Sequence, residues 1–373
     1  MNNNVDPDKF CKFLKHGIVY NNDATEFTIS PCCYFKKNYQ ISVDADISAQ
    51  INAYRKSWLE EDFNSTCKIC LDAEFSGATS YRQASFDAVD SSKDISFVTV
   101  AVNKKCNLAC PSCGPHSSSF WYQQNIRDGV SHPTKIINLH QEDRAGIITE
   151  KFVDVFKSNE FRSIDYIKFG GGEPLMSSTH LEILKLINNP EQTTVQYTSN
   201  FSIEPTKEIL DIWSRFRLIK WCASVDGINE QFELLRWPYK WSNFCKFKKQ
   251  AWETVPGNVM FGIEHTLNPL NVWYFADFKQ WFDREFAENR LGDKSDLNLH
   301  TCFGELGLEQ TPPALRAALK NRFGSNHSVV LLLEKLPYNG SYSTMVNYLD
   351  NLDYRRQTNW RNTFKEVSDY FLN

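Results

Sequence analysis

The chain has 373 residues, 42% of them hydrophobic and 23% charged, a balance typical of a globular protein with room for one α/β domain and a smaller module. Its formal net charge of −4 provides no general basic surface, so no nucleic-acid partner is expected. No run approaches the roughly 18 apolar residues of a membrane helix, and residues 1–8 are polar and acidic. We therefore expect a cytoplasmic protein without a membrane partner.

Residues 1–94 predict a small, irregular module. The segment is rich in Asn, Asp and Ser, and only residues 47–61 carry apolar side chains at helical spacing. Such a loop-rich segment buries little surface on its own, so it needs a further source of stability. A bound metal would supply it, and the segment holds five cysteines: Cys11, Cys32, Cys33, Cys67 and Cys70.

From Ser96 onward, apolar β-type runs alternate with helical patterns. This alternation predicts a parallel sheet joined by crossover helices, here a partial (β/α)6 TIM-like barrel over residues 95–305. A mostly helical extension over residues 306–373 follows, with helices expected at 315–323 and 360–371. We expect barrel strands at 97–102, 164–169, 193–198, 218–225, 259–266 and 297–301, and helices at 150–157, 181–187, 209–216, 244–254 and 272–286.

Three of the eleven cysteines follow the first barrel strand directly. Cys106, Cys110 and Cys113 have the spacing C-x3-C-x2-C, which lets one loop bring three thiolates to one centre. Three thiolates on a [4Fe–4S] cluster leave one iron open, and that iron can bind the amino and carboxylate groups of S-adenosylmethionine (SAM). A zinc ion with His116 as a fourth ligand, or a set of buried free thiols, is the alternative interpretation.

Polar and glycine residues also gather after the next strands. Gly171, Gly172 and Glu173 follow the second strand, and glycine there lets the backbone approach a ligand closely. Barrels of this type build their active sites at the carboxyl ends of the strands. The later strand ends add Ser199, Asn200, Ser224 and Asp226, and Arg236 follows in a Glu-Leu-Leu-Arg segment.

These motifs together resemble the radical SAM superfamily. The string from Cys106 to Trp121, CNLACPSCGPHSSSFW, is similar to a subgroup of twitch-domain-containing radical SAM proteins, several of them phage-encoded. The resemblance covers roughly residues 9–275. It implies an enzyme that cleaves SAM reductively to a 5′-deoxyadenosyl radical, which abstracts hydrogen from a substrate. It also implies an electron donor such as flavodoxin or ferredoxin, and the host cytoplasm as the location of a phage protein.

The resemblance assigns roles to the strand-end residues. Gly171 and Gly172 would contact the SAM amino group, and Glu173 would brace the turn or contact the amine. Arg236 would pair with the SAM carboxylate; a surface ion pair with Glu230 or Glu233 is the alternative. The ribose or carboxylate of SAM would meet Ser199, Asn200, Ser224 and Asp226.

The cysteines of residues 1–94 form a second set. The run from Cys67 to Arg82 again resembles the twitch-type subgroup, in which similar cysteines bind an auxiliary [4Fe–4S] cluster. In those proteins the module follows the barrel, whereas here it precedes it. The ligands implied are Cys11, Cys32, Cys67 and Cys70, with Cys33 as the alternative to Cys32. Spacing alone also suits a structural zinc ion.

The substrate class follows only from the resemblance, because twitch modules are associated with peptide or protein modification. A nucleotide or another small molecule is the alternative, and so is a zinc-stabilised binding protein without catalysis. A peptide substrate predicts an open groove with an exposed sheet edge, and a small molecule predicts a closed pocket. Free, buried thiols are expected at Cys222, Cys245 and Cys302.

Overall fold

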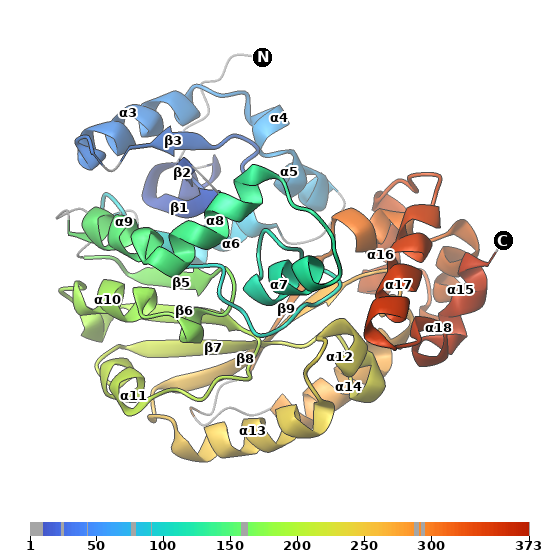
Figure 1. Cartoon of the computed structure of the whole chain (residues 1–373). Coiled ribbons are helices and arrows are strands. Elements are labelled where there is room, and N and C mark those ends of the chain that lie inside the picture. Colours follow the sequence, from blue (N-terminus) through green and yellow to red (C-terminus); the bar gives the residue numbers. More distant parts are fainter. Residues whose placement is uncertain are drawn as a thin grey trace.

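The computed structural model describes residues 10–23, 26–42, 44–75, 80–90, 92–157, 163–286, 291 and 295–372. A nine-stranded sheet runs through this part of the chain in the order β3-β2-β1-β4-β5-β6-β7-β8-β9 (Figure 1). The strands are β1 (Gly17–Asp23), β2 (Glu26–Ser30), β3 (Tyr39–Ile41), β4 (Phe97–Ala101), β5 (Tyr166–Gly170), β6 (Thr194–Ser199), β7 (Leu218–Ser224), β8 (Val259–Leu267) and β9 (Asp296–Thr301).

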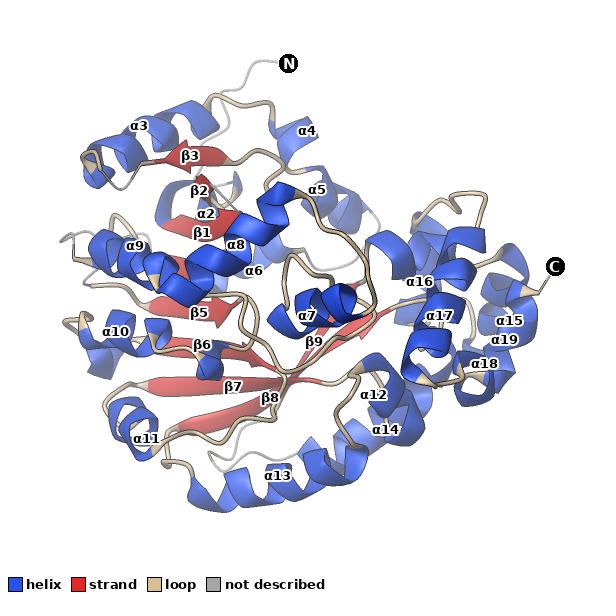
Figure 2. Ribbon diagram, viewed as in Figure 1, coloured by secondary structure: helices blue, strands red, loops and turns tan. Residues whose placement is uncertain are grey.

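The six strands β4 to β9 are parallel and pair in chain order, so the predicted partial (β/α)6 TIM-like barrel is confirmed. Crossover helices join them, as Figure 2 shows. These are α7 (Ser119–Arg127), α8 (Thr134–Ala145), α9 (Ile147–Phe156), α10 (Thr179–Lys185), α11 (Lys207–Trp213), α12 (Asn229–Leu235), α13 (Trp241–Thr254) and α14 (Phe275–Phe286). Helices α7, α8 and α12 were not predicted.

Alternate residues of each strand face opposite sides of the sheet. On one side the strands are apolar and pack on the helices: Trp221 is fully buried, 5.3 Å from Trp213 of α11 and 5.9 Å from Phe247 of α13 between ring centroids. The inner side carries polar residues, among them Lys168 and Glu264. The barrel therefore has an apolar shell and a polar interior.

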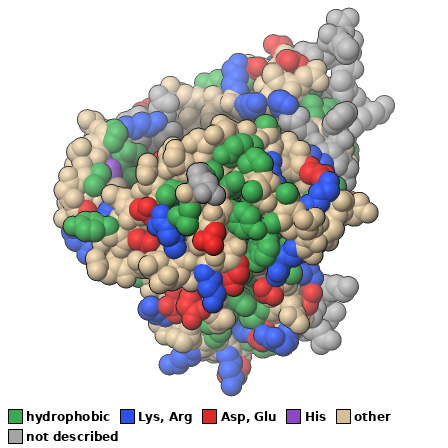
Figure 3. All heavy atoms as spheres, turned by 90° about the vertical axis from the view of Figure 1, so that its right-hand side faces the viewer, with side chains coloured by type: hydrophobic (Ala, Val, Ile, Leu, Met, Phe, Trp, Pro, Cys, Tyr) green, Lys and Arg blue, Asp and Glu red, His purple; other side chains and the backbone are tan. Residues whose placement is uncertain are grey.

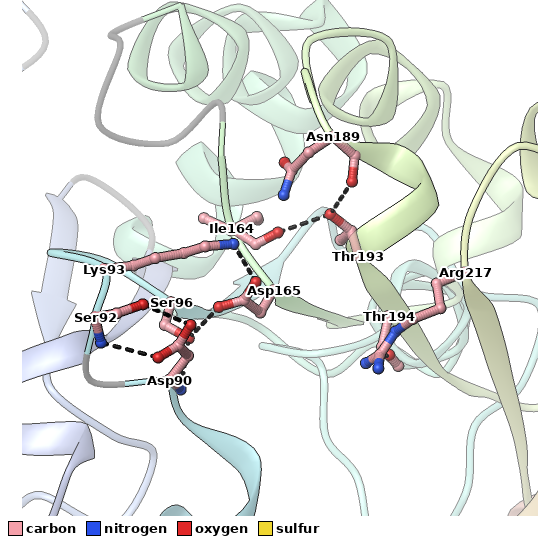
Figure 4. A network of polar contacts seen from close by, with 10 residues as sticks. All are labelled: Asp90, Ser92, Lys93, Ser96, Ile164, Asp165, Asn189, Thr193, Thr194 and Arg217. Carbon is pink, nitrogen blue, oxygen red and sulfur yellow. Dashed lines mark hydrogen bonds and ion pairs between the residues drawn. The ribbon is translucent and has the colours of Figure 1, made fainter.

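A polar network ties the amino-terminal ends of the strands together, away from the predicted site (Figure 4). Asp165 forms an ion pair with Lys93 and accepts a hydrogen bond from Ser96 Oγ at 2.8 Å. Thr193 Oγ1 donates to the carbonyl of Ile164 at 2.7 Å. This network lies at the end of the barrel that contributes to stability, whereas ligands bind at the opposite end.

The prediction of an irregular N-terminal segment was wrong. Strand β1 pairs in parallel with β4, and β2 pairs antiparallel with β1, so the segment extends the barrel sheet. Strand β1 ends in Asn and Asp residues and β3 has only three residues, so pairing with the sheet rather than local propensity stabilises them. The helices of this segment are α2 (Phe13–His16), α3 (Ile47–Leu59), α4 (Phe63–Thr66), α5 (Lys68–Phe75) and α6 (Tyr81–Ala88).

The C-terminal extension is helical, as predicted. Its helices are α15 (Pro313–Phe323), α16 (Ser328–Lys335), α17 (Ser343–Arg356), α18 (Trp360–Thr363) and α19 (Lys365–Ser368). Figure 3 looks onto this side of the molecule and shows hydrophobic side chains across the middle of the face, with charged side chains around them. Among the described helices, none is long and apolar enough to cross a membrane.

Candidate functional site

The three-cysteine loop starts five residues after β4 and is held by hydrogen bonds from several elements. Trp121 Nε1 of α7 donates to the carbonyl of Cys110 at 2.8 Å, and Ala109 N donates to the carbonyl of Trp237 at 2.8 Å. Within the loop, Cys113 N donates to the carbonyl of Cys110 at 2.9 Å. These bonds fix the backbone that carries the thiols.

The three thiols interact with one another. A hydrogen bond from Cys113 and the positive charge of Arg236 lower the pKa of Cys110, despite its burial. Burial and the nearby Cys110 raise the pKa of Cys106 to about 12. The loop therefore stabilises a thiolate at Cys110, and a thiolate is the form that binds metal.

The turn after β5 lies directly on this loop. Gly171 has φ +108°, and a Cβ atom there would lie 2.7 Å from the carbonyl oxygen of Asn103. Gly172 N donates to that carbonyl at 2.8 Å, and Glu173 N donates to the carbonyl of Lys105 at 2.6 Å. Glycine is thus required for the close approach of the two backbones.

The carboxylate of Glu173 is fully buried and braces the strand ends, one of the two roles predicted for it. It accepts hydrogen bonds from Leu175 N at 3.2 Å, Ser199 Oγ at 3.0 Å and Asn200 N at 2.6 Å. Burial raises the pKa of Glu173 to about 7, although these three donors lower it. Both carboxylate oxygens are therefore engaged within the protein.

Asn200 connects the end of β6 to the cysteine loop. Its Nδ2 donates to Asn107 Oδ1 at 2.8 Å and lies 3.7 Å from Cys106 Sγ. The predicted pair Ser199 and Asn200 thus lies beside the loop, with Ser199 bonded to Glu173 and Asn200 reaching the first cysteine.

The predicted surface ion pair of Arg236 with Glu230 or Glu233 was wrong. Arg236 is buried, with 9% of its surface exposed, and its Nη2 lies 2.7 Å from Asp226 Oδ2. Its Nη1 lies 3.9 Å from Cys110 Sγ. The error has a physical reason: the partner lies at the end of β7, ten residues earlier, whereas helical spacing favours nearer carboxylates.

Some buried polar atoms beside the loop have no hydrogen-bond partner in the described part of the chain. They are Arg236 Nε and both side-chain amide atoms of Asn103. Leaving such atoms without a partner is unfavourable, so they fit a polar ligand held between the loop and Arg236. Three thiols with unpartnered buried polar atoms beside them suit an iron–sulfur cluster with SAM.

A cavity of about 990 Å³ opens beside the loop. Cys113, His116, Arg236 and Ser224 line one part of it, and Lys168, Glu264 and His300 line another. Lys168 Nζ lies 3.3 Å from Glu264 Oε1, and Gln196 Nε2 donates to the same oxygen at 2.8 Å. His300 pairs with the other oxygen of Glu264.

Lys168, Glu264 and His300 were not predicted as site residues. They occupy inner-face positions of β5, β8 and β9, and the alternation of polar side chains within otherwise apolar strands was the available signal.

The second cysteine set is gathered in the N-terminal segment. Cys11, Cys32, Cys67 and Cys70 are each at most 8% exposed, whereas Cys33 is exposed. Burial and neighbouring thiolates, including those of Cys11 and Cys70, raise the pKa of Cys32 and Cys67. In the described residues, no group of three or more His, Cys, Asp or Glu side chains converges on the position of a single metal ion.

Comparison with known proteins gives distant structural similarities. No family model matches the sequence, and no curated protein matches it. The structure is similar to anSMEcpe with bound AdoMet (TM-score 0.39, 15% identity, 60% of this chain and 59% of that one). It is also similar to TYW1 with a lysine-pyruvate adduct bound (TM-score 0.32, 15% identity, 60% of this chain and 70% of that one). A third similar structure is Streptococcus suis SuiB (TM-score 0.36, 11% identity, 92% of this chain and 69% of that one).

The chain thus spans about 59% of anSMEcpe, and similarity at this level carries no argument about activity.

The burial of Glu173 predicts a pH-dependent stability. Its pKa in the folded protein, about 7, lies above that of an unfolded glutamate, so the folded state binds more protons between these values. Its contribution to the free energy of unfolding should therefore fall as the pH rises from about 4.5 to 7. In chemical unfolding experiments, the stability of wild type relative to Glu173→Gln should therefore decrease over this range.

Glu182→Gln on α10, where the side chain is partly exposed and pairs with Lys185 at 3.0 Å, is the control and should show no such trend. A wild-type to Glu173→Gln difference that is independent of pH would contradict the assignment.

Proposed function

We propose that the chain is a radical SAM enzyme whose Cys106, Cys110 and Cys113 hold a [4Fe–4S] cluster. The observation that carries this proposal is the direct bonding of the three-thiol loop to the Gly171–Glu173 turn, beside the buried donors of Arg236. When bound, the cluster and SAM supply the reductive cleavage that yields a 5′-deoxyadenosyl radical. A twitch-type protein of phage origin is the more specific identity that the sequence resemblance supports.

The residues around the loop would bind and orient SAM. Backbone groups of Gly171 and Gly172 can reach its amino group, since no side chain intervenes. Arg236, oriented by Asp226, offers its free Nε to the carboxylate. Asn200 and Ser224 are placed near the loop and the cavity, where they can contact the ribose or carboxylate.

The cavity would hold the substrate. Its walls would place a substrate beside Cys113 and Arg236. A peptide or protein substrate is supported by the resemblance and by the exposed side chains of Leu299 on edge strand β9 and Phe303 just after it. A small molecule such as a nucleotide is the alternative, and a flavodoxin or ferredoxin is the electron donor we propose.

The second cysteine set would hold an auxiliary [4Fe–4S] cluster, with a zinc ion as the alternative. The burial of Cys32 and the exposure of Cys33 support Cys32 as the fourth ligand with Cys11, Cys67 and Cys70. Four buried thiols whose charges repel one another need a bound cation when they ionise, which supports a metal at this position.

Removing the three loop cysteines tests the enzyme assignment. Protein purified without oxygen should contain roughly eight iron atoms if both clusters are four-iron cubes. The variant with Cys106, Cys110 and Cys113 all replaced by Ala should keep about half of the iron and form no 5′-deoxyadenosine after reduction. Cys245→Ala, outside both sets, is the control and should resemble wild type.

A colourless wild-type protein that contains only zinc would instead favour a zinc-stabilised binding protein. SAM cleavage by the triple variant would also overturn the assignment.

The adjacent pair Cys32 and Cys33 gives a matched test of the auxiliary site. Cys32→Ala should lose about half of the iron, because a cluster with three remaining thiolates and no free fourth ligand is less firmly held. Cys33→Ala should retain all of it. Iron and sulfide analysis of the two variants decides the question, and the reverse pattern would assign Cys33 as the ligand.

A further inference from the structure

Arg356, the last residue of α17, lies between two indole rings. Its guanidinium carbon is 4.5 Å from the ring centroid of Trp121 on α7 and 4.5 Å from that of Trp237. A cation between two aromatic faces is favourable, especially when little water reaches it. The C-terminal extension therefore places a positive charge between two residues that hydrogen-bond to the cysteine loop.

This charge is buried without a carboxylate to balance it. Arg356 is 9% exposed, and no carboxylate of the described residues lies within ion-pair distance of it. Gln124 Oε1 accepts from its Nη2 at 3.2 Å, and its Nε has no hydrogen-bond partner among the described residues. The charge of Asp128 also acts on Arg356, but this carboxylate forms its ion pair with Arg355, at 2.6 Å.

An uncompensated buried cation is unfavourable, so such a residue is expected to face a negative charge in the working protein. The negative charge available near Arg356 is that of the thiolates on the cysteine loop. Trp121, one of the two rings that hold Arg356, donates to the carbonyl of Cys110. Tyr348, on the same helix as Arg356, donates to the carbonyl of Pro111 at 2.8 Å.

Arg356 differs in this respect from Arg236, another cation near the loop. The charge of Arg236 is balanced by Asp226 at 2.7 Å. A thiolate at Cys110 would attract Arg356 through space, and Arg356 forms no ion pair with a carboxylate of the described residues.

We infer that Arg356 supplies an unpaired positive charge to the anionic group held by Cys106, Cys110 and Cys113, and thereby raises the reduction potential of that group. This inference rests on the proposed function. Adding one electron makes the thiolate-bound group more negative, and a nearby cation in a dry environment stabilises the more negative state. Arg356 binds no metal; it acts through the field at the loop.

The test is an EPR-monitored redox titration of the holoprotein, following the reduced-state signal that SAM perturbs. Arg356→Met keeps an unbranched apolar side chain between the indoles but removes the charge. Gln124→Glu keeps Arg356 and places a carboxylate on its hydrogen-bond partner, which neutralises the charge without emptying the site. Both variants should lower the midpoint potential by ~59 mV, which corresponds to a tenfold smaller equilibrium constant for the one-electron reduction.

Two further variants separate charge from packing. Arg356→Lys keeps the charge and should stay close to the wild-type potential. Arg361→Met removes a similar cation that lies 4.5 Å from the ring of Trp360 and pairs with Asp350 at 3.0 Å, so the potential should not change. A purely structural role of Arg356 would instead alter iron content or unfolding, with the potential unchanged.

Potentials of Arg356→Met and Gln124→Glu that equal the wild-type value, with a cluster present, would overturn the role of Arg356 alone. If Arg356→Met does not retain a cluster, Gln124→Glu decides by itself. A wild-type protein that forms no cluster would overturn both the proposed function and this inference.

Discussion

The arrangement of the site depends on the buried carboxylate of Glu173. It joins the turn after β5 to the end of β6, while its backbone N–H bonds to the loop after β4. Parallel strands end at one edge of a sheet, so only short links are needed between their loops. Burying the carboxylate is unfavourable in itself, and the three donors that surround it offset much of that cost. The result is a cysteine loop whose backbone is set by its neighbours before any ligand binds.

The segments on either side of the barrel take part in this arrangement. The N-terminal strands extend the barrel sheet through β1 and carry the second cysteine set next to it. The C-terminal helix α17 brings Tyr348 and Arg355 to the wall of the cavity and Arg356 to the indoles beside the loop. The division of the chain at residues 94 and 305 remains a prediction. The pairing of β1 with β4 crosses the first position, and the contacts of α17 with the cysteine loop cross the second.

Sequence patterns predicted the barrel strands well because each is a short apolar run that ends in a distinctive turn. The strand predicted at 259–266, for example, is Val259–Leu267 in the structure. Strands β1 to β3 escaped prediction because they are stabilised by pairing with one another and, through β1, with the distant strand β4. The cysteine loop and the turn Gly171 to Glu173 could be recognised from the sequence, because the residues within each motif are close together in the chain. Glu264 with Lys168, and Arg356 with Trp121, are brought together only by the fold, across 96 and 235 residues.

The central claim is that three cysteines hold a cluster with an iron open to SAM. The most direct measurement is the EPR spectrum of the reduced, anaerobically purified protein before and after SAM is added. The account predicts an iron–sulfur signal that SAM changes, because its amino and carboxylate groups would bind the cluster itself. A protein without such a signal, or a signal that SAM leaves unchanged, would contradict the account.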